Sequence, residues 1–574
     1  MIPPIRATPA WPRFCKQPLL RGLAALVLAT VAAASPAQAP TAAAKGNSGT
    51  LPSLGDGSDL PAAAERRIGD RIAVSIYRDP DYVDDPVLTD YVQTIWQPLL
   101  TAARARGELS AELDERFAWQ LFLIRDRTIN AFALPGGYFG VHLGLISTVA
   151  SGDELAAVLA HELSHVTQRH ISRLMTQQSK QAPWMIAAMV LGALASSKNP
   201  NAGAAAIVGG QAIAAQGQLN FSRDMEREAD RVGFGVMQDA GYASGGVTGM
   251  FEKLQQANRL NDNGSFPYLR SHPLTTERIA EAQARVQLVP NKAPLADSAR
   301  QQRLHALMAA RARVLAVPGV DVLRTLVAEA QRRTGPAAGL PTVASTSADP
   351  SGAALVVLPA LPALPARPAS ASAVAFPSPQ LSAIREAGTV YAGAFAAAQL
   401  RDFTVARSLL GRLRSMVADD PRASKAAELL AIEIELLDGK TPANAATADI
   451  GKAATRAELL LQARSLTQAG RAPEVAQALQ TWVAVHPRDA LAWQLLAVAH
   501  GQQGQTVRAI RADAESRAAQ LDYGGALDRL KAAQAAMRSN PGNADHVDGS
   551  IIDTRTRQVE SILKEQALQD TVDR

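Results

Sequence analysis

The amino-acid sequence predicts a mainly α-helical protein with a small β-sheet that continues into an α-solenoid of repeated helix pairs. Residues 61–333 hold long runs with apolar residues at helical spacing and only short runs with β-like alternation. Residues 334–379 are rich in Pro, Ala and Ser, as expected for a linker. Residues 380–565 contain positions that recur every 34 residues, the period of tetratricopeptide repeats. We therefore expect two folded domains joined by the linker, which fits a chain of 574 residues.

The first 39 residues have the composition of a secretory signal peptide. Four basic residues and no acidic residue accompany an apolar run, residues 23–34, and small residues follow it. Cleavage is expected after Ala39, with Ala34 as the competing site because a proline follows Ala39. The alternative is an uncleaved membrane anchor, for which the apolar run is short. Residues 40–60 are predicted to form a flexible leader.

Charge and cysteine content narrow the class of protein further. Without residues 1–39 the chain has 54 basic and 53 acidic residues, so the net charge falls from +5 to +1. This balance argues against a nucleic-acid partner. Cys15 is the single cysteine and precedes the apolar run, so the mature chain forms no disulfide and carries no lipid anchor at that residue. Export without disulfides suits the periplasm of a Gram-negative bacterium.

The first folded domain begins with helical patterns at residues 65–72 and 85–105. Residues 117–124 and 137–143 read as strands, and Pro135-Gly136-Gly137 marks the turn between extended segments. A strand beside a catalytic helix can hold a peptide substrate by adding it to the sheet edge, whereas the alternative is a hairpin that serves only the core.

The segment His161-Glu162-Leu163-Ser164-His165 is an HExxH sequence inside a predicted helix from Asp153 to about Leu174. Residues four apart share a helical face, so both imidazoles point the same way and can bind one zinc ion. Glu162 then lies close enough to take a proton from zinc-bound water.

A catalytic zinc ion usually has three protein ligands and one open position. The HExxHxxGxxH pattern is excluded, because Gln168 stands in place of the glycine and Ile171 in place of the histidine. His170 is half a turn out of phase with His161, so we interpret it as a helix-surface histidine or as an outer hydrogen-bond partner of the site.

A second helix supplies a better third ligand. Glu226 and Asp230 are four apart in Arg223-Asp224-Met225-Glu226-Arg227-Glu228-Ala229-Asp230 and share one helical face. Glu226 can complete a His2Glu set, and Asp230 can accept a hydrogen bond from the far ring nitrogen of a zinc histidine. Glu228 faces elsewhere and is predicted to be a surface carboxylate. The alternative for the whole segment is a solvated, charged helix.

These motifs resemble the M48 family of zinc metallopeptidases, which are gluzincins of the HExxH…ExxxD type. Residues 130–141 are similar to that family's strand and loop before the zinc helix, and Ser271-His272-Pro273 with Arg278 resembles its SHPxxxxR motif. The resemblance covers residues 61–330 by motif and residues 380–565 only in architecture. It implies a zincin-like fold, one Zn²⁺ ion per chain and metalloendopeptidase activity. It also implies that His272 either caps the zinc as a fourth ligand or stabilises the transition state; a loop residue is the alternative.

Two apolar runs separate the HExxH helix from Glu226, in residues 184–195 and 202–215. Each is too short to span a bilayer. They suit a helical hairpin that covers the site or contacts a membrane surface or an unfolded protein, or else two buried core helices. Residues 303–332 are predicted to be helical and to pack on the catalytic domain.

Beyond the linker, Leu459, Ala463, Gly470 and Ala478 recur 34 residues later as Trp493, Ala497, Gly504 and Ala512, with glycine at the turn of each helix pair. Stacked helix pairs form a concave surface that binds peptides or partner proteins, whereas the alternative is a helical tail that serves only packing.

The resulting hypothesis is an exported endopeptidase that acts on misfolded or stalled envelope proteins, with repeats that bind clients or the outer-membrane barrel assembly machinery. A chaperone or assembly adaptor with secondary proteolysis is the alternative from another class. An integral-membrane protease is disfavoured, because neither apolar region is long enough to span the bilayer.

Overall fold

The computed structural model describes residues 60–177, 223–259, 268–289, 298–316, 319–332, 379–539 and 546–572. The chain divides into two units, Met1–Asp56 and Gly57–Arg574, and every described residue belongs to the second. The predicted signal peptide, the leader up to residue 59, both apolar runs and the linker up to residue 378 lie outside the described residues.

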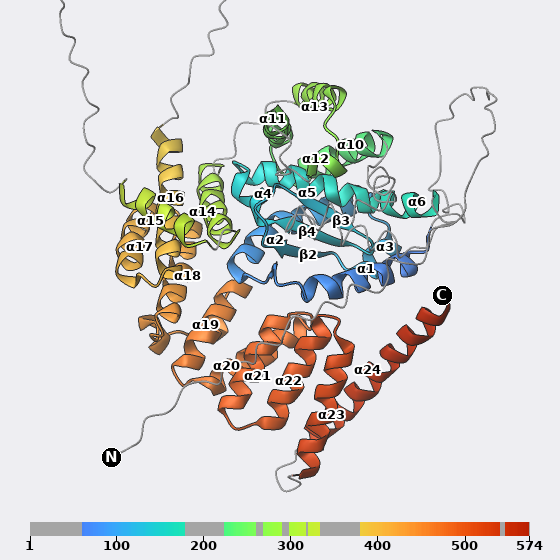
Figure 1. Ribbon diagram of the computed structural model, residues 1–574, viewed down its shortest axis with the longest axis vertical. Coiled ribbons are helices and arrows are strands. Elements are labelled where there is room, and N and C mark those ends of the chain that lie inside the picture. Colours follow the sequence, from blue (N-terminus) through green and yellow to red (C-terminus); the bar gives the residue numbers. More distant parts are fainter. Residues whose placement is uncertain are drawn as a thin grey trace, which may run out of the picture. The chain divides into compact units, whose positions relative to one another are not determined.

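A four-stranded sheet forms the centre of the first domain (Figure 1). The strand order is β1-β2-β4-β3; β2 and β4 are parallel, and the other two pairs are antiparallel. β3 therefore lies at one edge of this sheet. The strands are β1 (Tyr82–Val83), β2 (Gln120–Ile124), β3 (Ala131–Leu134) and β4 (Tyr138–His142).

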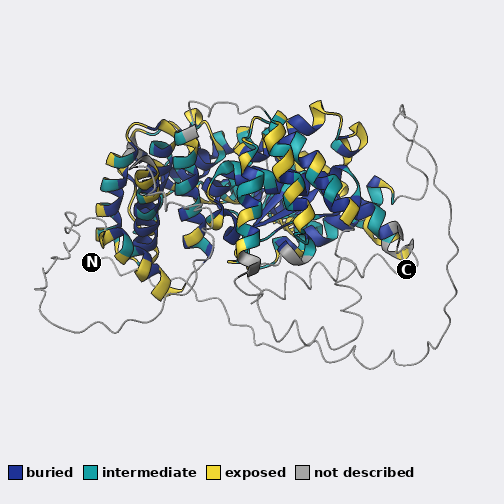
Figure 2. Ribbon diagram, turned by 90° about the horizontal axis from the view of Figure 1, so that it is seen from above, coloured by how far each residue is buried: buried dark blue, intermediate teal, exposed yellow. Residues whose placement is uncertain are grey.

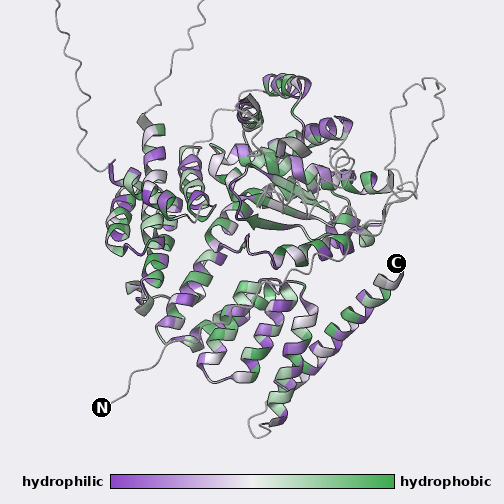
Figure 3. Cartoon of the chain, in the orientation of Figure 1, coloured by the Kyte–Doolittle hydropathy of each residue, from purple (hydrophilic) through white to green (hydrophobic). Residues whose placement is uncertain are grey.

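Alternating side chains bury both faces of the sheet. In β2, Phe122 and Ile124 pack against α1, whereas Leu121 and Leu123 join the larger core that contains α2 and α5. This period of two places a helical layer on each face, as expected for strands that are apolar along their whole length. The strands are accordingly dark blue in Figure 2, which marks buried residues, and mostly green in Figure 3, which marks apolar ones.

Helices outnumber strands in the described residues, which confirms the prediction of a mainly α protein with a small sheet. The first domain has α1 (Ala62–Tyr77), α2 (Pro86–Ala105), α3 (Ala111–Arg116), α4 (Leu143–Thr148), α5 (Gly152–Thr167), α6 (His170–Gln177), α10 (Arg223–Asp239), α11 (Gly245–Arg259), α12 (Tyr268–Ser271) and α13 (Thr276–Leu288).

The HExxH helix, α5, has a defined start. The Ser151 hydroxyl accepts a hydrogen bond from the Glu154 amide at 3.2 Å. The Glu154 carboxylate accepts one in return from the Ala150 amide at 2.6 Å. This reciprocal arrangement resembles a capping box and fixes the first turn of the helix. α5 then packs on α2, β3, α10 and α11, which leaves most of its residues buried.

The prediction of one continuous helix from Asp153 to Leu174 is wrong. α5 ends at Thr167, and Arg169 adopts a left-handed backbone conformation with φ of 58° before α6 begins at His170. No glycine or proline marks this break in the sequence, so helical periodicity alone could not locate it.

The region predicted as helical over residues 303–332 forms two helices, α14 (Ser298–Ala316) and α15 (Val320–Arg332). α14 packs on α4 and on α16, and α15 packs on α16. Thus α14 connects the sheet-containing region to the helices that begin at Pro379. Those helices are α16 (Pro379–Gln399), α17 (Phe403–Val417), α18 (Pro421–Leu437), α19 (Arg456–Gln468), α20 (Ala472–Val485), α21 (Ala490–Gln502), α22 (Thr506–Ala519), α23 (Tyr523–Ser539) and α24 (His546–Val572), with short 3₁₀ turns at Ala443–Ala446 and Ile450–Lys452.

The C-terminal region is helical, and each helix from α19 to α24 packs on the next. Gly470 and Gly504 lie at the α19–α20 and α21–α22 turns with φ of 79° and 71°. Glycine adopts this left-handed conformation without steric cost, which explains why it recurs at that position of the 34-residue pattern. Among the described residues, no helix combines the length and apolarity needed to cross a membrane.

Candidate metal centre

Four side chains from three segments converge in the first domain, and we call them the ligand cluster: His161 and His165 from α5, Glu226 from α10, and His272 directly after α12. All four are buried, and one potential ligand atom from each lies within 4.8 Å of the others. The structure therefore brings together the three residues that the sequence proposed as metal ligands and His272, the possible fourth ligand that the family resemblance implied.

The spacing of the ligand atoms fits a tetrahedral metal ion. The Nε2 atom of His161 lies 3.0 Å from Nε2 of His165, 3.3 Å from Nδ1 of His272 and 3.4 Å from Oε2 of Glu226. Zinc–ligand bonds of about 2.0–2.1 Å in a tetrahedron place neighbouring ligand atoms roughly 3.3 Å apart. The measured separations lie on either side of that value.

The chemistry of the cluster also fits zinc. Imidazole nitrogen and carboxylate oxygen are ligands that zinc favours. Lone pairs from three imidazoles and a carboxylate meet in a buried space, where a cation would reduce their mutual repulsion. The residues present can therefore hold one Zn²⁺ ion.

Glu162, the acid of the HExxH sequence, lies beside this cluster. Its Oε1 atom is 3.5 Å from Nε2 of His272, and its side chain is 2% exposed. Burial raises the pKa of Glu162, although His272 and His161 act in the opposite direction. A carboxylate with a raised pKa at this position can accept a proton and later return it.

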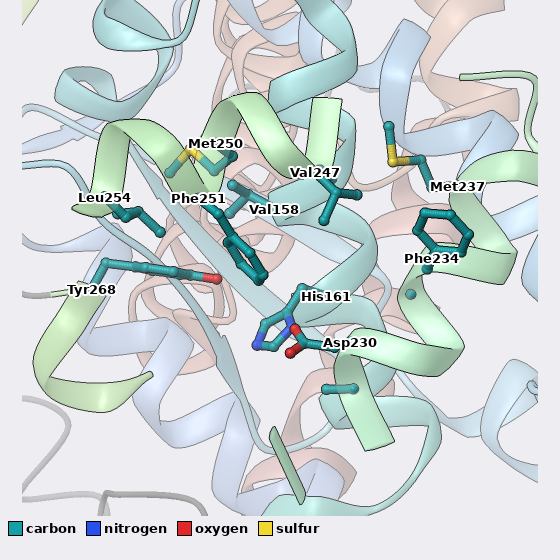
Figure 4. A pocket seen from close by; sticks show the side chains of 13 residues that line it. Val158, His161, Asp230, Phe234, Met237, Val247, Met250, Phe251, Leu254 and Tyr268 are labelled. Atoms are coloured by element: carbon teal, nitrogen blue, oxygen red, sulfur yellow. The ribbon is translucent and has the colours of Figure 1, made fainter. Parts of the chain in front are cut away.

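Asp230 contacts the far side of the first histidine. Its Oδ1 atom lies 3.0 Å from Nδ1 of His161, and Figure 4 shows the two side chains pointing toward each other. A carboxylate that accepts the Nδ1–H proton leaves the Nε2 lone pair for a metal. This is the contact that the ExxxD spacing predicted for Asp230.

Arg278 holds the carboxylates of Glu226 and Asp230, both on α10, together. Its Nη1 atom lies 2.9 Å from Oε2 of Glu226, and its Nε and Nη2 atoms donate to Asp230 at 2.7 and 2.8 Å. Nη1 also donates to the Pro273 carbonyl at 2.8 Å, which ties the segment after His272 to the same guanidinium. The sequence offered Arg278 only as part of a motif match, because its contacts depend on tertiary packing.

The electrostatic environment favours positive charge at the cluster. Burial alone would lower the pKa of His161, but hydrogen bonds to Asp230 and Glu226 outweigh it and raise that pKa to about 10. Burial and the neighbouring His161 hold the pKa of His165 well below its usual value. Burial would raise the pKa of Asp230, but hydrogen bonds from Arg278 and His161 lower it to about 2. Burial would also raise the pKa of Glu226, but His272 and His161 outweigh it and lower that pKa, so Glu226 and Asp230 are both ionised.

Two residues outside the cluster contact each other. Glu228 was predicted to be only a surface carboxylate, but its Oε2 atom lies 2.9 Å from Nε2 of His170. Of the two roles considered for His170, the structure matches that of an outer hydrogen-bond partner, because the residue is fully buried and its Nδ1 atom lies 2.9 Å from Nδ1 of His165. The helix break at Arg169 produces both contacts, because it turns His170 back toward His165.

An apolar pocket adjoins the cluster on the side of His161 and Asp230 (Figure 4). α5, α10 and α11 supply most of its lining, and Tyr268 of α12 closes one side. The Tyr268 ring also stacks on His272 at a centroid distance of 4.7 Å. Nothing in the sequence singled out Tyr268, since a lone tyrosine carries no spacing signal.

The fold and the ligand cluster together are those of a zincin-like domain with a candidate metal site. Residues 89–286 match the family model of Peptidase family M48, so this part of the chain is similar to that family. The structure places the cluster, Glu162 and Asp230 inside the matched residues.

Several known proteins are similar to part of the chain. A relative from Vibrio cholerae is 36% identical over 242 residues, which are 42% of this chain and 48% of the relative. The beta-barrel assembly-enhancing protease of Escherichia coli K12 is 33% identical over 238 residues, 41% of this chain and 47% of that protein. The mitochondrial metalloendopeptidase OMA1 of Arabidopsis thaliana is 30% identical over 164 residues, 29% of this chain and 31% of that protein. The match thus spans about half the length of the bacterial relatives.

Proposed function

We propose that this chain is a zinc-dependent endopeptidase that degrades misfolded or stalled envelope proteins. The observation that carries the proposal is the buried ligand cluster of His161, His165, Glu226 and His272, with Oε1 of Glu162 3.5 Å from Nε2 of His272. The names of the bacterial relatives support a link to outer-membrane assembly.

A zinc ion held by His161, His165 and Glu226 would lower the pKa of a bound water toward neutrality and would polarise a peptide carbonyl. Glu162 would take the proton from the attacking water and deliver it to the departing amine. Asp230 keeps the His161 ring in the tautomer that presents Nε2, and Arg278 keeps Glu226 and Asp230 in place.

The edge strand β3 packs beside α5, and we propose that it holds the substrate in an extended conformation by main-chain hydrogen bonds. The apolar pocket then takes an apolar side chain next to the scissile bond. Val158, Val247 and Met250 line this pocket. Val247→Trp would reduce its volume and should shift cleavage from large toward small apolar residues, whereas an unchanged preference would remove the pocket from substrate binding.

His272 completes a closed set of four ligands, because its Nδ1 atom lies 3.0 Å from Oε1 of Glu226 and 3.3 Å from Nε2 of His161. Four protein ligands leave no open position for water, as in structural zinc sites. We infer that this arrangement is latent and that His272 leaves the cluster when substrate binds. The alternative role for His272 is support of the transition state. In that case the displaced His272 would act on the substrate after it has left the cluster.

The closed cluster also favours a second function, that of a periplasmic chaperone or assembly adaptor whose proteolysis is secondary. The helical C-terminal region would bind clients or the outer-membrane barrel assembly machinery, and residues 184–215 would supply a peripheral membrane or client contact. If Glu162→Gln protein still supports outer-membrane assembly in cells that lack the wild type, the adaptor function is sufficient. A complete defect would show that proteolysis is required.

Two experiments test the proposal directly. Purified full-length protein should contain about one zinc per chain and cleave an unfolded casein-type substrate, and Glu162→Gln should keep the zinc and lose at least about a hundredfold in rate. Retained cleavage would remove Glu162 from the mechanism. Release of the protein from bacterial cells by osmotic shock would support the periplasmic location, and retention in the membrane fraction would contradict it.

A further inference from the structure

His165, the second α5 histidine of the ligand cluster, has a hydrogen-bond partner outside the cluster. Nδ1 of His165 lies 2.9 Å from Nδ1 of His170, and Nε2 of His170 lies 2.9 Å from Oε2 of Glu228. The same carboxylate oxygen accepts a hydrogen bond from Nη2 of Arg173 at 2.7 Å. A chain of contacts therefore runs from α10 through α6 to a metal ligand on α5.

The chemistry of these groups fixes where each proton lies. An ionised carboxylate only accepts, so Nε2 of His170 must donate to Glu228. A neutral imidazole carries one N–H, so Nδ1 of His170 is left as an acceptor, and Nδ1 of His165 must donate to it. Nε2 of His165 then keeps its lone pair for a metal. Burial lowers the pKa of His170 to about 4, which is consistent with a neutral ring.

The backbone is bent to make this contact possible. On a continuous helix, residues five apart point about 140° away from each other. The left-handed conformation of Arg169, with φ of 58°, ends α5 and brings His170 beneath His165. A non-glycine residue in that conformation is sterically strained, so neighbouring contacts must hold it there. Arg169 is held there by Glu65 and Ser172, each 3.0 Å from its guanidinium.

Helix α10 thus supplies a carboxylate that supports each of the two α5 histidines in the ligand cluster. Asp230 contacts His161 directly, and Glu228 reaches His165 through His170, while Glu226 of the same helix lies in the ligand cluster itself. We propose that Glu228 and His170 are positioning residues that fix the tautomer and ring orientation of His165 for zinc binding. This inference rests on the proposed zinc site.

Loss of such an outer partner typically costs about 10–100-fold in metal affinity. We expect that range for His170→Leu, which removes the acceptor for His165. His170→Asn should restore most of the affinity, because its amide oxygen can lie where Nδ1 was. Glu228→Ala, at a partly exposed position, should weaken binding about tenfold.

The experiment is a zinc titration of demetallated full-length protein against a competing chelator, with the melting temperature of the metal-free protein measured in parallel. Met175→Ala is the control for stability, since Met175 is buried on α6 but belongs to the core around α1 and the sheet. Asp224→Ala is the control for charge, because it removes an exposed carboxylate from the same helix as Glu228. Both controls should bind zinc as the wild type does.

The inference is supported if His170→Leu and Glu228→Ala lose zinc affinity while His170→Asn and both controls keep it. It is overturned if His170→Leu binds zinc as tightly as the wild type, or if Met175→Ala loses as much affinity as His170→Leu. A wild type that binds no zinc would instead overturn the proposed function, so the two failures are distinguishable.

Discussion

The guanidinium of Arg278 lies 2.9 Å from the carboxylate of Glu226, an expected zinc ligand, and donates two further hydrogen bonds to Asp230. Arg278 is 4% exposed, so this ion pair is made where water cannot replace a missing partner. Arg278 therefore links Glu226, the expected third ligand, to Asp230, the carboxylate that orients His161.

Arg278→Leu should destabilise the metal-free protein by about 3–5 kcal/mol, because it leaves two buried carboxylates without their cation. It should also weaken zinc binding. Arg285→Leu on the same helix is the matched control, since its partly exposed pair with Glu281 is worth at most about 1 kcal/mol. Urea unfolding of both variants measures the difference, and equal losses would show that Arg278 acts only as a surface cation.

His272→Ala tests the closed state of the ligand cluster. Removal of the fourth ligand should open a position for water, so we expect kcat/KM on an unfolded substrate to rise at least roughly tenfold, which is about 1.4 kcal/mol. The zinc content should stay near one per chain, because three ligands remain. A fall in rate at unchanged zinc content would assign His272 to the transition state instead, and an unchanged rate would exclude both roles.

His142 gives a prediction for acid stability that does not involve the metal. It is buried at the end of β4, its Nδ1 atom lies 2.8 Å from Oγ1 of Thr128, and Asp126 is 3.8 Å away. Burial lowers the pKa of His142 to about 4, although Asp126 acts in the opposite direction. In the unfolded chain a histidine takes up its proton near pH 6.5. Burial of neutral His142 therefore leaves the free energy of unfolding unchanged above that pH and lowers it by about 3 kcal/mol once the pH falls to 4.

The metal-free wild type should therefore lose more stability between pH 6.5 and pH 4 than His142→Asn, by about 3 kcal/mol. Phe132→Leu changes the ring beside His142 without removing the titrating group, so it should keep the wild-type slope. Parallel pH profiles for the wild type and His142→Asn would contradict the assignment.

Arg401 occupies a position that favours glycine. It follows α16 with φ of 63°, as Gly470 follows α19 with φ of 79°. Arg401→Gly should stabilise the protein by about 0.5–1 kcal/mol, and Gly470→Ala should destabilise it by about 1 kcal/mol through backbone strain alone, since an added Cβ meets no atom within 4 Å. Arg401→Ala keeps the strain but loses the contact with the Phe403 ring, so it should not stabilise. Thermal unfolding of the three variants measures these signs, and a stabilising Arg401→Ala would contradict the strain argument.

The sequence predicted the parts of the site that depend on local spacing. The HExxH interval places His161 and His165 on one face of a helix, and the ExxxD interval does the same for Glu226 and Asp230. Each pair therefore follows from helical geometry alone. That these two faces meet could be expected only from the chemistry they share, because Glu226 lies 61 positions after His165.

The parts that the sequence missed depend on tertiary packing. The break at Arg169 has no glycine or proline to mark it, so periodicity extended α5 through residue 174 and could not decide between a surface position and an outer hydrogen-bond role for His170. Glu228 was therefore interpreted as a surface carboxylate, although it contacts His170. Tyr268 enters the site from α12, far along the chain, and no spacing rule connects it to α5.

The most direct test of the metal centre is a crystal structure of the zinc-loaded protein with an anomalous difference map at the zinc edge. We predict one peak per chain, within about 2.0–2.2 Å of Nε2 of His161, Nε2 of His165 and a carboxylate oxygen of Glu226, with His272 as the fourth ligand in the closed state. The absence of a peak there, or a peak that is not bound by His161, His165 and Glu226, would contradict the proposal that these three side chains form a catalytic zinc site.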